Sequence, residues 1–279
     1  LGHAPSRVIK KLEKLKAVKG LVISNLKEHP KVCECCETSK MKKQRMSSKK
    51  PAEFKTKIPM ERWHGDVIGK FITTPQGSYA VIMADEATGY LMGKALKGKK
   101  FFEVFKTNLE RLENETGKRL KRFIYDDGKE VLDAEMRNYC KNKGIEIVQA
   151  APRAPQQNGF IERRVQTVMR MTRAVLKGSN LGTKFWPWAL KFAIYTLNRM
   201  PGRDKKKTPY ELIFKEKPSI AHLHPFGCIG FRMKNPMNVT KGGFGDKAER
   251  CRFIGYVGKQ TKTFVVLKEN GRIVKEAHV

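Results

Sequence analysis

The stretches IYDDG (residues 124–128) and NGFIERR (residues 158–164) organise the rest of this chain. In the first, a short apolar run ends on an acid, which is typical of a strand where it leaves a sheet. In the second, an acid stands where residues of helical spacing begin. Thirty-five residues separate Asp126 from Glu162, and a third acid, Asp66, lies upstream in the stretch WHGD. Their order suggests one constellation of three carboxylates.

Converging carboxylates supply the hard oxygen ligands that divalent cations such as Mg²⁺ prefer. Cations held in this way serve phosphoryl transfer, and the formal charge of +31 indicates a polyanionic partner.

Each acid also has a simpler interpretation. Asp66 and Asp126 can cap turns at strand ends, and Glu162 in the first turn of a helix gains less than about 1 kcal/mol from the helix dipole. The role of the adjacent Asp127 stays open.

Lysine and arginine outnumber aspartate and glutamate by 58 to 27 among 279 residues, of which 40% are hydrophobic. The hydrophobic fraction allows a packed core, and the excess of positive charge favours nucleic acid over an anionic membrane surface as the partner. No apolar run approaches the roughly 20 residues that span a bilayer, and no signal pattern opens the chain. We therefore expect a soluble intracellular protein. The first residue is Leu1, which suggests a piece of a longer polypeptide.

Residues 1–37 predict a small helical module, with apolar residues at helical spacing between Val8 and Val18. Cys33 and Cys36 have the spacing of a zinc half-site, and His3 is a candidate third ligand. The alternative for this CxxC is a turn with buried thiols. The six cysteines do not form the pattern of a disulfide framework, which favours reducing conditions.

Residues 38–59 predict a basic linker, with no acid between positions 40 and 50. A solvated tail is a common interpretation of such a run, but the basic charge of the whole chain favours contact with phosphates. The candidate DNA contacts in this linker are Lys40, Lys42, Lys43 and Arg45.

Residues 60–203 predict an α/β domain, in which strands alternate with helices after an antiparallel start. Short strands are expected at 66–68, 79–84, 122–125 and 145–148, and a helix from Phe101 that ends near Gly117. A polar loop is expected at 152–158, followed by a long helix with Glu162 in its first turn. Beside these acids, the candidate DNA contacts are Gln157, Asn158, Arg163 and Arg164.

Residues 204–279 predict a basic linker and a small β-rich module, because short apolar runs alternate with glycine and lysine. The runs lie at 227–231, 251–256, 263–267 and 272–274. Asp85 and Glu130 are interpreted as structural or supporting acids rather than ligands.

The ordered motifs resemble the integrases of Copia-type (pseudovirus) LTR retrotransposons over essentially the whole chain. HGD at 64–66 resembles the first catalytic Asp motif, YDDGKE at 125–130 the second, and PQQNGFIER at 155–163 the Glu motif. His3 with the CxxC resembles the end of an HHCC zinc module. Downstream, the matching pieces are NR at 198–199, KTPYE at 207–211, HL at 222–223, FGC at 226–228 and FIGY at 253–256.

The resemblance implies an RNase H-like core with a mixed five-stranded sheet, in which Asp66, Asp126 and Glu162 form a DD35E triad. It implies two Mg²⁺ (or Mn²⁺) held by these acids, and zinc held by His3, Cys33 and Cys36. The implied activity is integration: processing of the 3′ ends of the element's double-stranded DNA, then strand transfer into target DNA by a homo-oligomer. The implied place of action is the nucleus, with a cytoplasmic particle during replication.

Two departures from the family pattern keep alternatives open. Asp127 stands where the family usually has Asn, and the first His of the HHCC set is absent. A catalytically inactive or domesticated DNA-binding protein that keeps the fold is therefore the main alternative. A ribonuclease of the same fold is a third hypothesis, which the HHCC-like start and the basic β-rich end disfavour.

Overall fold

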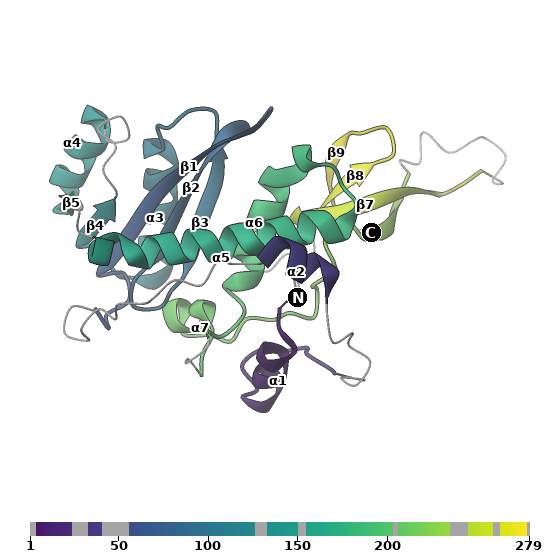
Figure 1. Cartoon of the computed structure of the whole chain (residues 1–279), viewed down its shortest axis with the longest axis horizontal. Helices are drawn as coiled ribbons and strands as arrows, with labels where there is room; N and C mark the ends of the chain where they lie inside the picture. The colour runs from purple at the N-terminus through teal and green to yellow at the C-terminus, as the bar shows by residue number, and fades with distance from the viewer. Residues whose placement is uncertain are drawn as a thin grey trace.

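A computed structural model of the chain describes residues 4–23, 33–40, 56–125, 133–149, 155–202, 206–234, 245–258 and 263–277. Two β-sheets are joined by one long helix, α5 (Pro155–Ser179), which runs from the first sheet to the second (Figure 1). None of the described helices is long and apolar enough to cross a membrane.

The first sheet has five strands in the order β3-β2-β1-β4-β5. Antiparallel pairing joins β1 to β2 and β2 to β3, whereas β1, β4 and β5 run parallel. This is the RNase H-like arrangement that the resemblance implied, so the expected fold class is confirmed. The strands are β1 (Arg62–Thr74), β2 (Gly77–Asp85), β3 (Leu91–Leu96), β4 (Arg122–Tyr125) and β5 (Glu146–Gln149).

Helices cover both faces of this sheet, which explains why β2 is an unbroken apolar run from Tyr79 to Ala84. Val81 and Met83 pack with α3 (Phe102–Thr116) and α4 (Ala134–Lys143), while Ile82 packs with α5 and α6 (Trp186–Leu197). Successive residues of a strand point to opposite faces, so a strand buried on both sides needs no polar alternation. The expected ends also agree, since α3 closes at Gly117 and α4 at Gly144 in the left-handed conformation that glycine favours.

Three local predictions were wrong. The strand through Asp66 extends over all of β1, because pairing with β2 continues past the short apolar run. The helix at the amino end, α1 (Ser6–Lys14), stops before Val18, and Lys16 has a positive φ of 44°. Helix α5 begins at Pro155 within the expected loop, since proline suits the first turn of a helix, where its missing N–H has no partner.

The second sheet is antiparallel in the order β6-β7-β8-β9, which confirms the β-rich end of the chain. It packs against α6 through a cluster of aromatic rings that includes Phe192, Phe226, Phe253 and Tyr256. Its strands are β6 (Ile229–Met233), β7 (Ala248–Tyr256), β8 (Phe264–Lys268) and β9 (Ile273–Glu276). Two short helices lie earlier in the chain: η2 (Thr183–Phe185) between α5 and α6, and α7 (Pro209–Phe214) between α6 and β6.

The two described amino-terminal segments pack in different places. Leu12 and Val18 join the core beneath the second sheet, and Lys19 forms a parallel bridge with Ser219. Helix α2 (Glu34–Lys40) lies along the carboxyl half of α5, where Lys177 Nζ donates to Thr38 Oγ1 at 2.8 Å (Figure 1). The boundaries predicted for an amino-terminal module therefore stay predictions.

Candidate active site

Strand β1 directs Asp66 to the face of the sheet that α5 covers. A Cβ on Gly65 would lie 2.5 Å from the ring of Phe123, so residue 65 faces the opposite layer and only glycine fits there. Its neighbours His64 and Asp66 point to the α5 face, because side chains alternate along a strand. Asp66 pairs with Ile82, whose side chain packs in the same cluster as Ile161 of α5. Asp66 is half-buried there.

Strand β4 ends next to this position. Tyr125, its last residue, pairs with Gly65 in the parallel register, so the chain leaves the sheet beside Asp66. Asp126 comes directly after Tyr125, but both Asp126 and Asp127 lie outside the described residues. The strand end agrees with the predicted triad, and the ligand role of Asp126 stays a prediction.

Helix α5 carries Glu162 at the solvent-exposed edge of the same layer. Ile161 is buried against the sheet, with 2% of its surface exposed, while Glu162 is exposed. The first turn of α5 contains no acidic residue, because the helix begins at Pro155 and Glu162 lies about two turns into it. The dipole explanation of Glu162 as a first-turn acid was therefore wrong, since that effect fades beyond the first turn.

A buried contact joins β1 to the start of α5 at the level of these acids. The ring of His64, only 1% exposed, lies 4.7 Å from the ring of Phe160, measured between centroids. His64 Nε2 is 2.9 Å from Glu86 Oε2, and Arg62 Nη1 donates to the same oxygen at 3.3 Å. We call Arg62, His64, Glu86 and Phe160 the clasp. His64 is two residues from Asp66 and Phe160 two residues from Glu162, so the clasp links the elements that carry both acids.

The two arginines after Glu162 lie in different environments. Arg163 is exposed, whereas the guanidinium of Arg164 lies 5.2 Å from the centre of the Phe160 ring and packs against the turn at Gly89. Burial, and then the charge of Arg163, lower the pKa of Arg164. Arg163 thus agrees better with the predicted DNA contact than Arg164, which extends the clasp.

The donor atoms of the described residues suit magnesium or manganese better than zinc. Among the described residues, no three His, Cys, Asp or Glu side chains are grouped closely enough to hold a metal ion. Asp66 and Glu162 are oxygen donors on facing elements and therefore suit Mg²⁺ or Mn²⁺, with Asp126 as the predicted third ligand. For zinc, Cys33 and Cys36 lie at the start of α2, and His3 is outside the described residues.

Comparison with known proteins identifies the family. No protein-family model matches the chain. Over 230 residues, 81% of the chain, it is 33% identical to the retrovirus-related Pol polyprotein from transposon TNT 1-94 of Nicotiana tabacum. It is 27% identical over 239 residues to that from transposon RE2 of Arabidopsis thaliana. The chain belongs to the integrase region of copia-type retrotransposon Pol polyproteins.

This integrase chain spans only 17% and 16% of the length of those two relatives. Among solved structures, it resembles a chain of the simian T-cell lymphotropic virus intasome in complex with PP2A regulatory subunit B56 gamma. That match has a TM-score of 0.47 and 17% identity, and covers 80% of this chain and 77% of the other.

The DNA contacts predicted for the integrase chain all stay predictions. Lys40 is the last residue of α2, and Gln157 and Asn158 belong to the first turn of α5 rather than to a loop. The remaining candidates in the basic linker, Lys42, Lys43 and Arg45, lie outside the described residues.

Sequence reasoning missed Glu86 and assigned its neighbour Asp85 correctly. Asp85 is fully buried and accepts hydrogen bonds from the Met60 N–H at 2.9 Å and the Thr88 N–H at 2.8 Å, so it is structural. Glu86 belongs to the clasp. Glu86 could have been found from the sequence, because it comes just after the run expected to be a buried strand. A carboxylate at such a buried position needs a charged or hydrogen-bonding partner.

The downstream motifs of the integrase family have structural roles here. The side-chain amide of Asn198 accepts from the Leu91 N–H and donates to the Leu91 carbonyl, both at 2.8 Å, and so joins α6 to β3. Arg199 lies 3.5 Å from the centre of the Tyr195 ring, and the Tyr195 hydroxyl is 2.6 Å from His222 Nε2. These contacts join α6 to β3 of the first sheet and to the segment at His222 that precedes the second sheet.

Proposed function

We propose that the chain is a metal-dependent polynucleotidyl transferase that processes the 3′ ends of the element's DNA and inserts them into target DNA. One observation supports this most strongly. Asp66 and the end of β4 lie side by side under α5, and the clasp joins that position to the helix that carries Glu162. The order and spacing of the three acids agree with this geometry.

In this proposal, Asp66, Asp126 and Glu162 hold two Mg²⁺ or Mn²⁺, which when bound stabilise the attacking and the leaving oxygen of the phosphodiester. Water is the nucleophile in 3′ processing, and the freed 3′-hydroxyl is the nucleophile in strand transfer. The chain's own contribution is positioning: Arg163 lies beside Glu162 to contact a phosphate, and the clasp keeps α5 against β1.

The partner in this proposal is double-stranded DNA, both element ends and target, bound by a homo-oligomer. The formal charge of +31 supports it, since phosphate contacts supply most non-specific affinity and make it strongly dependent on salt. The proposed place of action is the nucleus, after assembly in a cytoplasmic particle. Zinc bound at Cys33 and Cys36 is the least supported part, because no complete ligand set lies among the described residues.

The test is strand transfer on a short duplex with Mn²⁺, comparing the chain with Glu162→Gln. We expect Glu162→Gln to lower the rate by about a hundredfold or more, because charge stabilisation in the transition state is lost. The matched control is Glu103→Gln, an exposed acid of α3 on the opposite side of the sheet, which should keep full activity.

Equal rates for Glu162→Gln and the unchanged chain would refute the catalytic assignment. A folded chain that binds duplex DNA and transfers no strand would instead support the inactive DNA-binding protein. Cleavage of RNA in a hybrid, with no strand transfer, would favour the ribonuclease.

A further inference from the structure

Strand β6, one of the two edge strands of the second sheet, exposes three large apolar side chains. Ile229, Phe231 and Met233 have 50%, 63% and 64% of their surface exposed. They alternate along the strand and therefore share one face of the sheet. In the described part of the chain, β6 pairs only with β7, so its other edge is open for a further strand.

Two arginines of β7 share this face. Arg252 stands directly opposite Ile229, and Arg250 directly opposite Phe231, in the antiparallel register. Within the described residues, neither arginine has a carboxylate within 4.0 Å. On the other face of the same sheet, in contrast, Arg232 is paired with Glu249 and Glu276. A cavity next to the apolar side chains is lined by three basic residues, Arg250, Arg252 and Lys268, and by one acid, Glu269, so positive charge is in excess there.

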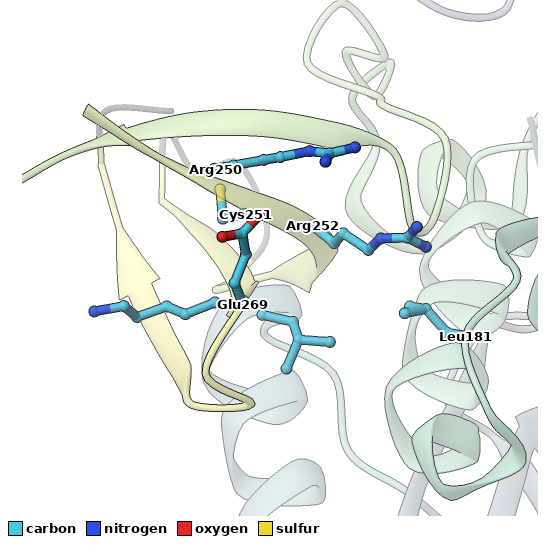
Figure 2. Close-up of a pocket in the computed structure, with 7 residues that line it drawn as sticks. Leu181, Arg250, Cys251, Arg252 and Glu269 are labelled. Atoms are coloured by element: carbon cyan, nitrogen blue, oxygen red, sulfur yellow. The ribbon is translucent and has the colours of Figure 1, made fainter. Parts of the chain in front are cut away.

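This cavity, of about 330 Å³, adjoins the face between β7–β8 and the end of α5. Its lining consists of Leu181, Arg250, Cys251, Arg252, Leu267, Lys268 and Glu269. Figure 2 shows that the side chains of Arg250 and Arg252 extend in the same direction, toward the helical side that carries Leu181. Arg252 Nη1 donates to the Ser179 carbonyl at 3.0 Å, so this guanidinium is already positioned. We call the exposed residues of β6 together with this cavity the β6 surface.

We propose that the β6 surface binds an extended, acidic segment of a partner protein. The segment adds as a strand to the open edge of β6, so that its backbone N–H and C=O groups hydrogen-bond with those of β6. Its apolar side chains cover Ile229, Phe231 and Met233, and its carboxylates pair with Arg250 and Arg252. This interaction is independent of the proposed catalysis, because none of these residues belongs to the candidate active site.

The chemistry of the β6 surface favours a peptide over the other occupants. DNA would place charged phosphates against three apolar side chains and leave the open strand edge without a partner. A second copy of the chain would bring another 31 positive charges to an already basic face. An acidic, apolar strand complements the charge, the exposed side chains and the backbone at once.

The test begins with a displayed library of random short peptides, selected against the whole chain. The enriched peptides are then measured by fluorescence polarisation against Phe231→Ser and Arg250→Glu. Matched controls are Ile72→Ser, an exposed apolar residue of β1, and Arg272→Glu, an exposed arginine just before β9. We expect peptides that alternate acidic and apolar residues, and a rise in Kd of about tenfold for each β6-surface variant with no change for the controls.

Three outcomes would overturn the proposal. The first is the absence of such peptides, or equal Kd values for β6-surface and control variants. In the second, Phe231→Ser weakens binding of a short DNA duplex, which would assign the surface to nucleic acid. In the third, sedimentation of the chain alone shows self-association that Phe231→Ser abolishes, which would assign it to a second copy.

Discussion

The two sheets of the integrase chain are buried to different degrees. Helices cover both faces of the five-stranded sheet, and Val81, Ile82 and Phe123 are fully buried. The four-stranded sheet is covered on one side by α6, while β6 exposes Phe231. Because both faces of the first sheet are buried, its candidate active site lies at its edge, where β4 ends and α5 carries Glu162. The second sheet keeps a face for binding.

The largest expected effect is loss of stability in the first sheet. Phe123→Ala removes a ring at the centre of the larger core, and we expect the free energy of unfolding to fall by about 3–5 kcal/mol. Denaturant titration followed by fluorescence measures this. A loss below about 1 kcal/mol would mean that the core relaxes around the cavity left by the ring. The first sheet would then not depend on burial more than the second sheet does.

The clasp should affect activity next. His64→Ala separates β1 from α5 beside Asp66, and we expect strand transfer to fall by about 10–100-fold, as for residues that support metal ligands. His64→Gln retains a donor for Glu86 and should recover part of the rate.

The readout that separates positioning from folding is the Mn²⁺ concentration for half-maximal activity. It should rise in His64→Ala and return toward the original value in His64→Gln. If His64→Ala lowers stability but leaves this Mn²⁺ concentration unchanged, the clasp contributes to packing and does not position the metal ligands.

A smaller effect concerns pH at the junction of the two sheets. Burial, and then the charges of Arg199 and His224, lower the pKa of His222 below its ordinary 6.5. The unfolded chain therefore binds this proton more readily, so stability falls as the pH drops through about 6.5 and levels off below the folded pKa. Thermal unfolding between pH 8 and roughly pH 5 measures this slope. His222→Gln should flatten it, and an equal slope in both chains would exclude His222 as its source.

The smallest effect is expected on the β6 surface. Phe231→Ser removes an exposed ring that has little core contact, so the free energy of unfolding should change by no more than about 0.5 kcal/mol. The same denaturant titration provides the value. A loss close to that of Phe123→Ala would show that Phe231 is a core residue, and the second sheet would no longer differ from the first.

Local periodicity predicted most of the first sheet. The strand expected at 122–125 coincides with β4, and the helix that starts near Phe101 ends at Gly117, because burial and glycine caps leave signals in neighbouring residues. The start of α5 was missed, since proline, glutamine and asparagine are common in loops and the first turn of a helix tolerates them equally.

The sequence alone determined the family, the basic charge and the order of Asp66, Asp126 and Glu162, because motifs and spacing are properties of the chain itself. Tertiary structure decided which side chains meet. His64 lies against Phe160, 96 positions away, Arg164 packs inward while Arg163 is exposed, and Phe231 faces solvent although its residue type favours a core. Such contacts depend on how elements far apart in the sequence pack together, and local sequence patterns do not predict that packing.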